Sequence, residues 1–375
     1  MRHIVYISGT RADFGLMATT LAQIDADPML RVSVIVTGMH LDPTYGETWR
    51  EIEASGLTIL GKVSVPMSPA TGATMARAIG TMTHAFTDLL EQTTPDCVLL
   101  LGDRGEMLAG ATAATHLNIP VAHVHGGERS GTIDESIRHA ITKLSHLHFA
   151  ATNEAANRII ALGEQPENVM VTGAPGLDGL TDVPQPDRAA LLNAVGLSAA
   201  NPTALMLFHP VLQEASDAGG QIDAVLTGLI QARWQGIVLT PNADAGSDAI
   251  RARIDALKTD QIRSFVHLPR AVFIAHMAGM DAMLGNSSAG IIEAASFGTP
   301  VVNIGSRQNM RERNANVRDV GVDADAIAAA LDKIAIAGRF PATNVYGDGN
   351  AGERITKILR AHPLDSPLLN KVLTF

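Results

Sequence analysis

Short runs of apolar residues recur along this chain, and segments of helical length separate them. The runs in the first half are Ile4–Ser8, Val32–Thr37, Thr58–Val63, Cys97–Leu101, Val121–Val124, His148–Ala151 and Val169–Thr172. Those in the second half are Ala204–Phe208, Ile237–Thr240, Phe265–Leu268, Ala282–Leu284 and Val301–Ile304. Because the runs are continuously apolar rather than alternating, both faces of each strand should be buried, as in parallel sheets covered by helices.

Helical spacing between these runs completes the pattern. The clearest predicted helices are Met75–Leu90, Met107–His116, Glu135–Leu144 and Ala324–Ile336. Alternating strands and helices predict an α/β fold. The length of 375 residues predicts two domains, and the proline-containing stretch 182–187 divides two such sets of strands. We therefore expect a first domain over 1–180 and a second over 181–354.

Charge and cysteine content narrow the classes of protein. The net charge is −10, from 28 Lys and Arg against 38 Asp and Glu, so no basic face is expected for a nucleic-acid backbone. The single cysteine, Cys97, excludes an intrachain disulfide and a cysteine-based zinc site. We find no signal-peptide pattern and no apolar run of 18 residues that could span a membrane. A cytoplasmic protein without nucleic-acid or membrane partners is expected.

Polar residues follow the apolar runs, where ligands bind in open parallel sheets. After Ile4–Ser8 comes Gly9-Thr10-Arg11, in which a tight turn and the start of a helix would place free N–H groups beside the Arg11 guanidinium. This combination suits an anion such as a phosphate. The alternative is a structural turn with an exposed arginine.

Three carboxylates, on Asp103, Glu128 and Asp134, follow two of the predicted strands. Their clustering predicts acid/base chemistry, in which neighbouring charges would set each pKa. The alternative is a set of ion pairs and helix-start acids. Thr132 and Glu135 have the spacing of a capping box, which predicts that a helix begins there.

His123 and His125 lie near these acids, and strand alternation would place both on one face. Clustered histidine and carboxylate can bind a metal. The spacing alone is a weak indication, so we expect neither a metal nor another cofactor.

The second half repeats the arrangement. His209 follows Ala204–Phe208, where it either packs or binds a ligand, and Asn242 follows Ile237–Thr240. After Ala282–Leu284, Ser287 and Ser288 begin a predicted helix, where hydroxyl and backbone donors suit a diphosphate. The alternative for these serines is plain helix capping. Glu293 could accept hydrogen bonds from ribose hydroxyls, and Arg307 adds a cation.

Eight segments together resemble the hydrolysing UDP-N-acetylglucosamine 2-epimerases of sialic-acid and related nonulosonate pathways. They span almost the whole chain and cover residues 9–15, 36–40, 102–104, 125–128, 132–143, 285–290, 297–308 and 346–350. The resemblance implies two Rossmann-like domains in a GT-B-like arrangement, with an interdomain cleft and a C-terminal helix, about 355–375, that packs back onto the first domain. A homo-oligomer, dimer or tetramer, is also expected.

The resemblance also assigns roles to residues of this chain. It implies nucleotide contacts at Arg11, Ala12, His209, Asn242, Ser287, Ser288, Glu293 and Arg307, with Arg104 in the cleft. It implies a catalytic set of Asp103, Glu128 and Asp134, to which His209 is added. The segment 257–261 lacks the paired histidines of the animal enzymes, so allosteric feedback is not carried over.

The implied reaction eliminates UDP from UDP-N-acetylglucosamine and adds water, which yields N-acetylmannosamine and UDP. The nearest alternative is the same reaction on a UDP-2,4-diacetamido-2,4,6-trideoxyhexose of the legionaminic acid route. A GT-B glycosyltransferase and a regulator that binds a nucleotide sugar are two further alternatives. The residues that read the C4 and C6 substituents are not identifiable from the sequence.

Overall fold

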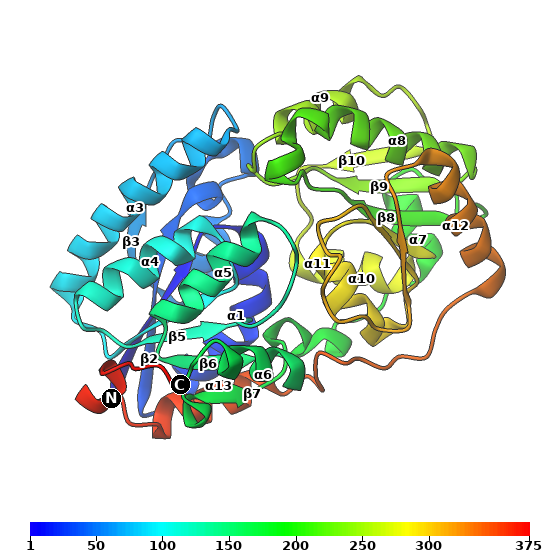
Figure 1. The fold of residues 1–375 in the computed structure, drawn as a ribbon. Helices are drawn as coiled ribbons and strands as arrows, with labels where there is room; N and C mark the ends of the chain where they lie inside the picture. The colour runs from blue at the N-terminus through cyan, green and yellow to red at the C-terminus, as the bar shows by residue number, and fades with distance from the viewer.

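The computed structural model describes residues 1–375 as two parallel β-sheets flanked by helices (Figure 1). The strands of the first sheet are β1 (Arg2–Ser8), β2 (Leu30–Thr37), β3 (Thr58–Val63), β4 (Cys97–Leu101), β5 (Val121–Val124), β6 (Leu147–Ala150) and β7 (Val169–Val171). The helices among them are α1 (Arg11–Ala26), α2 (Trp49–Ala54), α3 (Gly72–Thr93), α4 (Gly105–His116), α5 (Ile133–Leu144) and α6 (Asn153–Ala161). The predicted α/β class is confirmed.

The second sheet follows after α7 (Arg188–Ala194). Its strands are β8 (Thr203–Leu207), β9 (Gln235–Leu239), β10 (Ile262–Phe265), β11 (Ala282–Gly285), β12 (Val301–Ile304) and β13 (Val317–Val320). Its helices are α8 (Ala218–Gln231), α9 (Ser247–Ala256), α10 (Arg270–Gly279), α11 (Ser288–Ile292) and α12 (Ala324–Ala337). The chain ends with α13 (Ala351–Ala361) and α14 (Ser366–Leu369).

Strand order is the same in both sheets over their first six strands. The seven-stranded sheet has the order β3-β2-β1-β4-β5-β6-β7, and the six-stranded sheet has the order β10-β9-β8-β11-β12-β13. Every printed pairing is parallel. This is the doubly wound order of dinucleotide-binding folds, in which the chain reverses direction across the sheet between its first and fourth strands.

The apolar strands are buried on both faces, as their composition predicts. Side chains of β1 alternate between two clusters, since Ile4 and Tyr6 pack with α1 residues whereas Val5 and Ile7 pack with α3 and α4 residues. Two similar clusters cover the faces of the second sheet. Burial of this apolar area is the main favourable term in folding.

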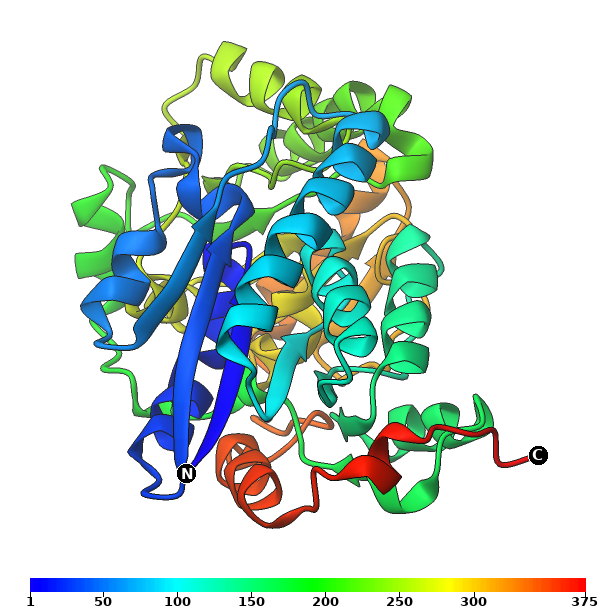
Figure 2. The same ribbon diagram turned by 90° about the vertical axis from the view of Figure 1, so that its left-hand side faces the viewer.

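The C-terminal segment returns from the second sheet to the first. In Figure 1 the orange-to-red chain passes along the lower edge of the molecule and places α13 beside the first sheet. Figure 2 shows α13 and the N-terminus at the same end of the molecule. Ile355 and Leu359 of α13 belong to the core cluster that contains β1 and α1. No helix is long and apolar enough to cross a membrane.

Two predicted features of the second sheet were wrong, and both concern edge strands. The expected strand Phe265–Leu268 lies at Ile262–Phe265 instead, and β13 was not expected. Both strands are only partly buried and carry polar residues, such as Arg263 and Asp319, inside them. An edge strand faces solvent on one side, so its apolar run is interrupted. The apolar residues after Phe265 line a cavity rather than extending the strand.

Candidate active site

The site lies between the two sheets, at the point where each strand order reverses. The loops after β1 and β4 meet the loops after β8 and β11 from the other sheet, and two neighbouring cavities are lined by residues of both. Ligands of doubly wound sheets bind at these reversal points.

The first of these, the serine cavity, has a volume of about 1140 Å³, including its open mouth. It contains most of the residues that the family resemblance assigns to the nucleotide. They come from loops after β1, β8, β9, β11 and β12: Arg11, Ala12, His209, Asn242, Ser287, Ser288, Glu293 and Arg307.

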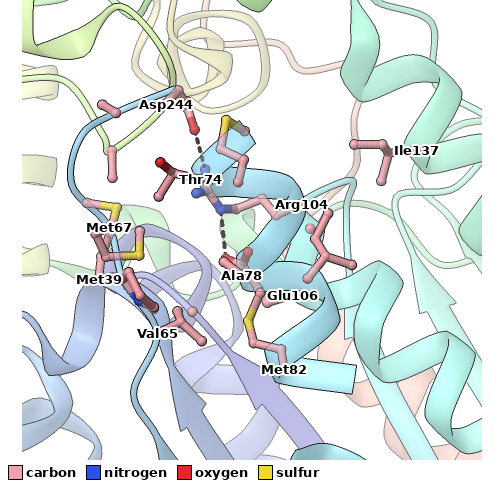
Figure 3. A pocket seen from close by; sticks show the side chains of 18 of the residues that line it. Met39, Val65, Met67, Thr74, Ala78, Met82, Arg104, Glu106, Ile137 and Asp244 are labelled. Atoms are coloured by element: carbon pink, nitrogen blue, oxygen red, sulfur yellow. Dashed lines mark hydrogen bonds and ion pairs between the residues drawn. The ribbon is translucent and has the colours of Figure 1, made fainter. Parts of the chain in front are cut away.

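The second, the carboxylate cavity, has a volume of about 820 Å³, including its open mouth. Asp103, Arg104 and Asp134 line it together with Asp244 from the other half. Figure 3 shows Arg104 between Glu106 and Asp244. Arg307 lines both cavities and therefore marks the boundary between them.

His209 is fixed by Asn286 of the neighbouring loop. Its backbone N–H donates to Asn286 Oδ1 at 2.7 Å, and Asn286 Nδ2 donates back to the His209 carbonyl at 2.8 Å. Burial, with the positive charges of Arg307 and Arg104, lowers the pKa of His209 to about 3. The imidazole is therefore neutral at physiological pH, when it can bind a ligand by hydrogen bonding.

The two serines have different roles at the start of α11. Ser287 caps the helix, because its hydroxyl accepts from the Ala289 N–H at 3.3 Å. Ser288 is the first helical residue and lines the serine cavity without a hydrogen bond to its hydroxyl in the structure. Gly285 turns the chain with φ of 128°, and a Cβ there would collide with the Leu207 carbonyl. The capping alternative thus describes Ser287, and Ser288 remains available for a ligand.

Two other nucleotide candidates are held by ion pairs at the wall of the serine cavity. Arg11 begins α1, and its Nε lies 2.6 Å from Glu51 Oε1. Its buried Nη2 has no hydrogen-bond partner. Buried donors are normally satisfied, so this nitrogen suits an anionic ligand. Glu293 is buried and pairs with Arg270, which holds its carboxylate beside the cavity.

Arg104 joins the two halves of the chain inside the carboxylate cavity. Its Nε donates to Glu106 Oε1 at 2.8 Å, and its Nη1 lies 3.5 Å from Asp244 Oδ1 (Figure 3). Glu106 fills the space above Gly9, where any side chain would collide with it. The glycine after β1 is therefore required by close packing of Glu106, in addition to any contact with a ligand.

Asp103 is bound by a buried arginine of α5. Arg138, of which 1% is exposed, donates to Asp103 Oδ2 and to the Glu128 carbonyl. Burial alone would raise the pKa of Asp103, but the charges of Arg138, Arg311 and Arg307 outweigh it and lower the pKa. Asp103 is therefore held as a carboxylate.

Glu128 does not line either cavity. It is 3% exposed, and its two carboxylate oxygens contact His125 Nδ1 and Arg311 Nη1. Burial opposes its ionisation, but Arg311 and His125 lower the pKa well below the usual range. This permanent ion pair joins the loop after β5 to the loop after β12 across the two halves. The geometry favours a positioning role over proton transfer.

Asp134, in the first turn of α5, is the member of the trio that is free to exchange a proton. Its side chain faces the carboxylate cavity and forms no ion pair. Burial and the negative charge of Asp103 raise its pKa, and Asp244 adds to the effect. Two acids whose environments move their pKa values apart typically divide the acid and base roles of a reaction.

The helix start at this point was predicted correctly, but the capping box was not. Helix α5 begins at Ile133 after Thr132, whose side chain makes no capping bond. Glu135 instead accepts from the N–H groups of Ser130 and Gly131, which orders the glycine-containing loop before the helix. A spacing pattern cannot distinguish these two sets of backbone donors.

His123 and His125 do not share a face. Strand β5 ends at Val124, and His125 has φ of 64°, so alternation stops before it. His123 Nε2 is 2.7 Å from the Gly102 carbonyl, whereas His125 contacts Glu128. No group of three potential metal ligands occurs in the structure.

Several charged residues of the site were not identified from the sequence. Arg138 had one detectable indication, because it lies four residues after Asp134 and therefore on the same face of α5. Arg311 and Asp244 had none, since each pairs with a residue more than a hundred positions away.

Comparison with known proteins agrees with this arrangement. The family model described as UDP-N-acetylglucosamine 2-epimerase matches residues 22–360. A UDP-N,N'-diacetylbacillosamine 2-epimerase (hydrolyzing) of Legionella pneumophila is 46% identical over 372 residues, which cover 99% of each chain. A UDP-N-acetylglucosamine 2-epimerase of Neisseria meningitidis serogroup B is 32% identical, over 96% of this chain and 95% of the relative.

A solved structure establishes the same fold. The crystal structure of UDP-GlcNAc 2-epimerase from Neisseria meningitidis, bound to UDP-GlcNAc, superimposes with a TM-score of 0.78 at 20% identity. The match covers 96% of this chain and 99% of the other, so the GT-B-like arrangement is confirmed. The chain therefore belongs to the UDP-N-acetylglucosamine 2-epimerase family, as a 2-epimerase of the hydrolysing type.

Proposed function

We propose that this protein is a hydrolysing 2-epimerase of UDP-2,4-diacetamido-2,4,6-trideoxyglucose, which is UDP-N,N'-diacetylbacillosamine. The observation that carries the proposal is the 46% identity, over almost the full length of both chains, with the Legionella relative of that name. The expected substrate UDP-N-acetylglucosamine is the second candidate. It is supported by the 32% identical Neisseria relative.

The serine cavity is proposed to hold the UDP part of the substrate. Its polar side chains come from the reversal points of both sheets, and Ser288 and Arg11 Nη2 present donors with no partner in the protein. A helix start and arginines are well suited to a diphosphate, because both supply directed N–H donors and positive potential.

The carboxylate cavity is proposed to hold the sugar. Asp134 would take the C2 proton while the bond between C1 and the UDP oxygen breaks, which leaves a 1,2-unsaturated sugar. Water then adds its oxygen to C1, and C2 receives a proton on the opposite face. The products are UDP and the 2-epimeric free sugar. A carboxylate with a raised pKa is a stronger base than an ordinary one, which favours Asp134 for this step.

Charge stabilisation of the departing diphosphate is assigned to Arg307 and Arg104. Arg307 lies at the boundary of the two cavities, where the bond to the leaving group must lie if the sugar and the nucleotide occupy one cavity each. Donors placed in advance at the developing charge are usually the largest contribution to catalysis. Asp103, held by Arg138, keeps its negative charge and thereby maintains the raised pKa of Asp134.

The proposal is tested by offering both sugar nucleotides to the purified protein without an acceptor. UDP release is followed by a coupled assay, and the sugar product is identified by NMR. We expect the manno-configured diacetamido sugar as product, with a higher kcat/KM than for UDP-N-acetylglucosamine. The reverse preference would favour the second candidate, and UDP release only with an acceptor would indicate a glycosyltransferase.

The elimination step has an isotopic consequence. In D₂O the product should carry deuterium at C2, because the proton delivered to that carbon comes from a group that exchanges with solvent. In H₂¹⁸O the label should enter the C1 hydroxyl and not UDP. Protium at C2 with retained configuration, as after simple glycoside hydrolysis, would falsify the epimerase mechanism.

A further inference from the structure

One wall of the carboxylate cavity is apolar and rich in methionine. It is built by the segment between β3 and α3 together with the first turns of α3. Ten residues of this region line the cavity: Val65, Pro66, Met67, Ala70, Thr71, Thr74, Met75, Ala78, Ile79 and Met82. Met39, after β2, extends the same wall.

Most of these side chains remain partly exposed in the free protein. Met39, Met67, Met75 and Ile79 are half-buried, whereas Met82 belongs to the core. Figure 3 shows Met39, Val65 and Met67 together on the side of the cavity opposite Ile137 of α5. Apolar side chains left facing solvent inside a cavity gain free energy when an apolar part of a ligand covers them.

The same wall offers little to a sugar hydroxyl. Its polar side chains are Thr71 and Thr74, whose hydroxyls lie 3.0 Å apart and bond to each other. The Thr71 hydroxyl also caps α3 by accepting from the Thr74 N–H. No amide, carboxylate or basic side chain of this segment lines the cavity. A hydroxyl placed against the wall would lose hydrogen bonds to water without replacing them.

We propose that Met39, Met67, Met75 and Ile79 form a specificity surface that receives the C4 acetamido and C6 methyl groups of the sugar. This inference rests on the proposed function and names the residues that determine its substrate. A diacetamido-trideoxyhexose has three methyl groups and no hydroxyl at C6, whereas N-acetylglucosamine has one methyl group and hydroxyls at C4 and C6. Methionine suits such a surface, because its flexible thioether adapts to irregular apolar shapes.

The position of the wall agrees with this assignment. Asp103, Arg104 and Asp134 line the cavity together with the methionines, so the reacting side of the sugar can face the carboxylates while its other substituents face α3. The Ala70 carbonyl accepts from the Gly246 N–H at 3.4 Å, and its N–H donates to Asp248 at 3.3 Å. The segment that carries Met67 is therefore attached to both halves of the molecule.

The test replaces Met67 and Met75 by glutamine, which has a similar length and adds an amide. Affinities for both sugar nucleotides are measured by calorimetry in an Asp134→Asn background, where turnover does not interfere, and kcat/KM is measured in the otherwise wild-type protein. We expect the preference for the diacetamido sugar nucleotide to fall about 10-fold or more for each variant, since one methyl-sized contact changes discrimination by about 10–200-fold. UDP affinity should stay unchanged, because the serine cavity is intact.

Met29→Gln is the matched control, since Met29 is 56% exposed and lines neither cavity. It should leave both the preference and UDP affinity at wild-type values. An unchanged preference in Met67→Gln and Met75→Gln, or a parallel loss of UDP affinity, overturns the specificity surface. Failure of the proposed function is a separate result: the wild-type protein would then bind the sugar nucleotides without releasing UDP from either of them.

Discussion

The two cavities of the cleft are built in different ways. In the serine cavity, His209 and Ser287 are held by neutral hydrogen bonds between neighbouring loops of the second half. In and beneath the carboxylate cavity, charged groups pair across the two halves, as Arg104 does with Asp244 and Arg311 with Glu128. Binding geometry is thus preformed within one half, whereas catalytic geometry depends on how the two halves meet. Substitutions in the two cavities should accordingly affect different measurements.

The largest effect is expected for Asp134→Asn. An amide keeps the shape but cannot exchange the proton, so kcat should fall by about 10²–10⁴-fold. UDP affinity, measured by calorimetry, should change little because Asp134 lines only the carboxylate cavity. Asp88→Asn, on the exposed surface of α3, is the control and should leave kcat unchanged. A kcat within a few-fold of the wild type would remove Asp134 from the acid/base set.

Glu128→Gln should lower stability as well as turnover. It leaves the buried guanidinium of Arg311 without its negative partner, and breaking a buried ion pair costs roughly 3–5 kcal/mol. Calorimetry should therefore show a lower melting temperature, together with reduced kcat. Asp134→Asn should not lower the melting temperature, because that carboxylate has no ion partner and its charged form is disfavoured by burial. Wild-type stability in Glu128→Gln would mean that Glu128 is not a positioning residue.

Ser287→Ala and Ser288→Ala should differ from each other. Loss of the Ser288 hydroxyl removes a donor to a charged phosphate, worth about 1.5 kcal/mol, so the Kd for UDP should rise about 10-fold at unchanged melting temperature. Loss of Ser287 removes the cap of α11 and should lower stability by about 1 kcal/mol. Equal UDP affinity in Ser288→Ala and the wild type would leave helix capping as the only role of the pair.

The smallest effect concerns pH and His209. Its pKa is lowered to about 3 in the folded protein, against about 6.5 in an unfolded chain. Below pH 6.5 the unfolded state therefore binds a proton that the folded state does not, and stability falls as the pH decreases toward 3. Between pH 7 and pH 5.8 this contribution amounts to about 1 kcal/mol. His209→Gln should lack it, which thermal unfolding at the two pH values can measure.

A NMR titration of the free protein gives an independent check. The His209 imidazole should not titrate between pH 5 and pH 8, unlike the exposed His84. A midpoint near 6.5 for His209 would show that the serine cavity is open to solvent around this ring. The contrast between neutral bonding in one cavity and charge pairing in the other would then be weaker.

The sequence alone was sufficient for the α/β class, for most strands and for the family. Continuous apolar strands determine burial on both faces of a parallel sheet, and loops at strand ends carry Arg11, Asp103, His209 and Ser288 because the ligand site of such sheets lies there. The edge strand β13 was missed because it is exposed on one side and lacks a continuous apolar run.

Only the tertiary structure distinguished the three carboxylates. Asp103, Glu128 and Asp134 have the same chemistry in the sequence, and their differences arise from Arg138, Arg311 and the cavity around them. Protonation depends on burial and on charges within a few ångströms, and most of these charges come from distant positions in the chain. The methionine wall was also not recognised, because apolar residues at helical spacing usually belong to a core. Whether such a residue faces a core or a cavity is decided by which other segments pack against it.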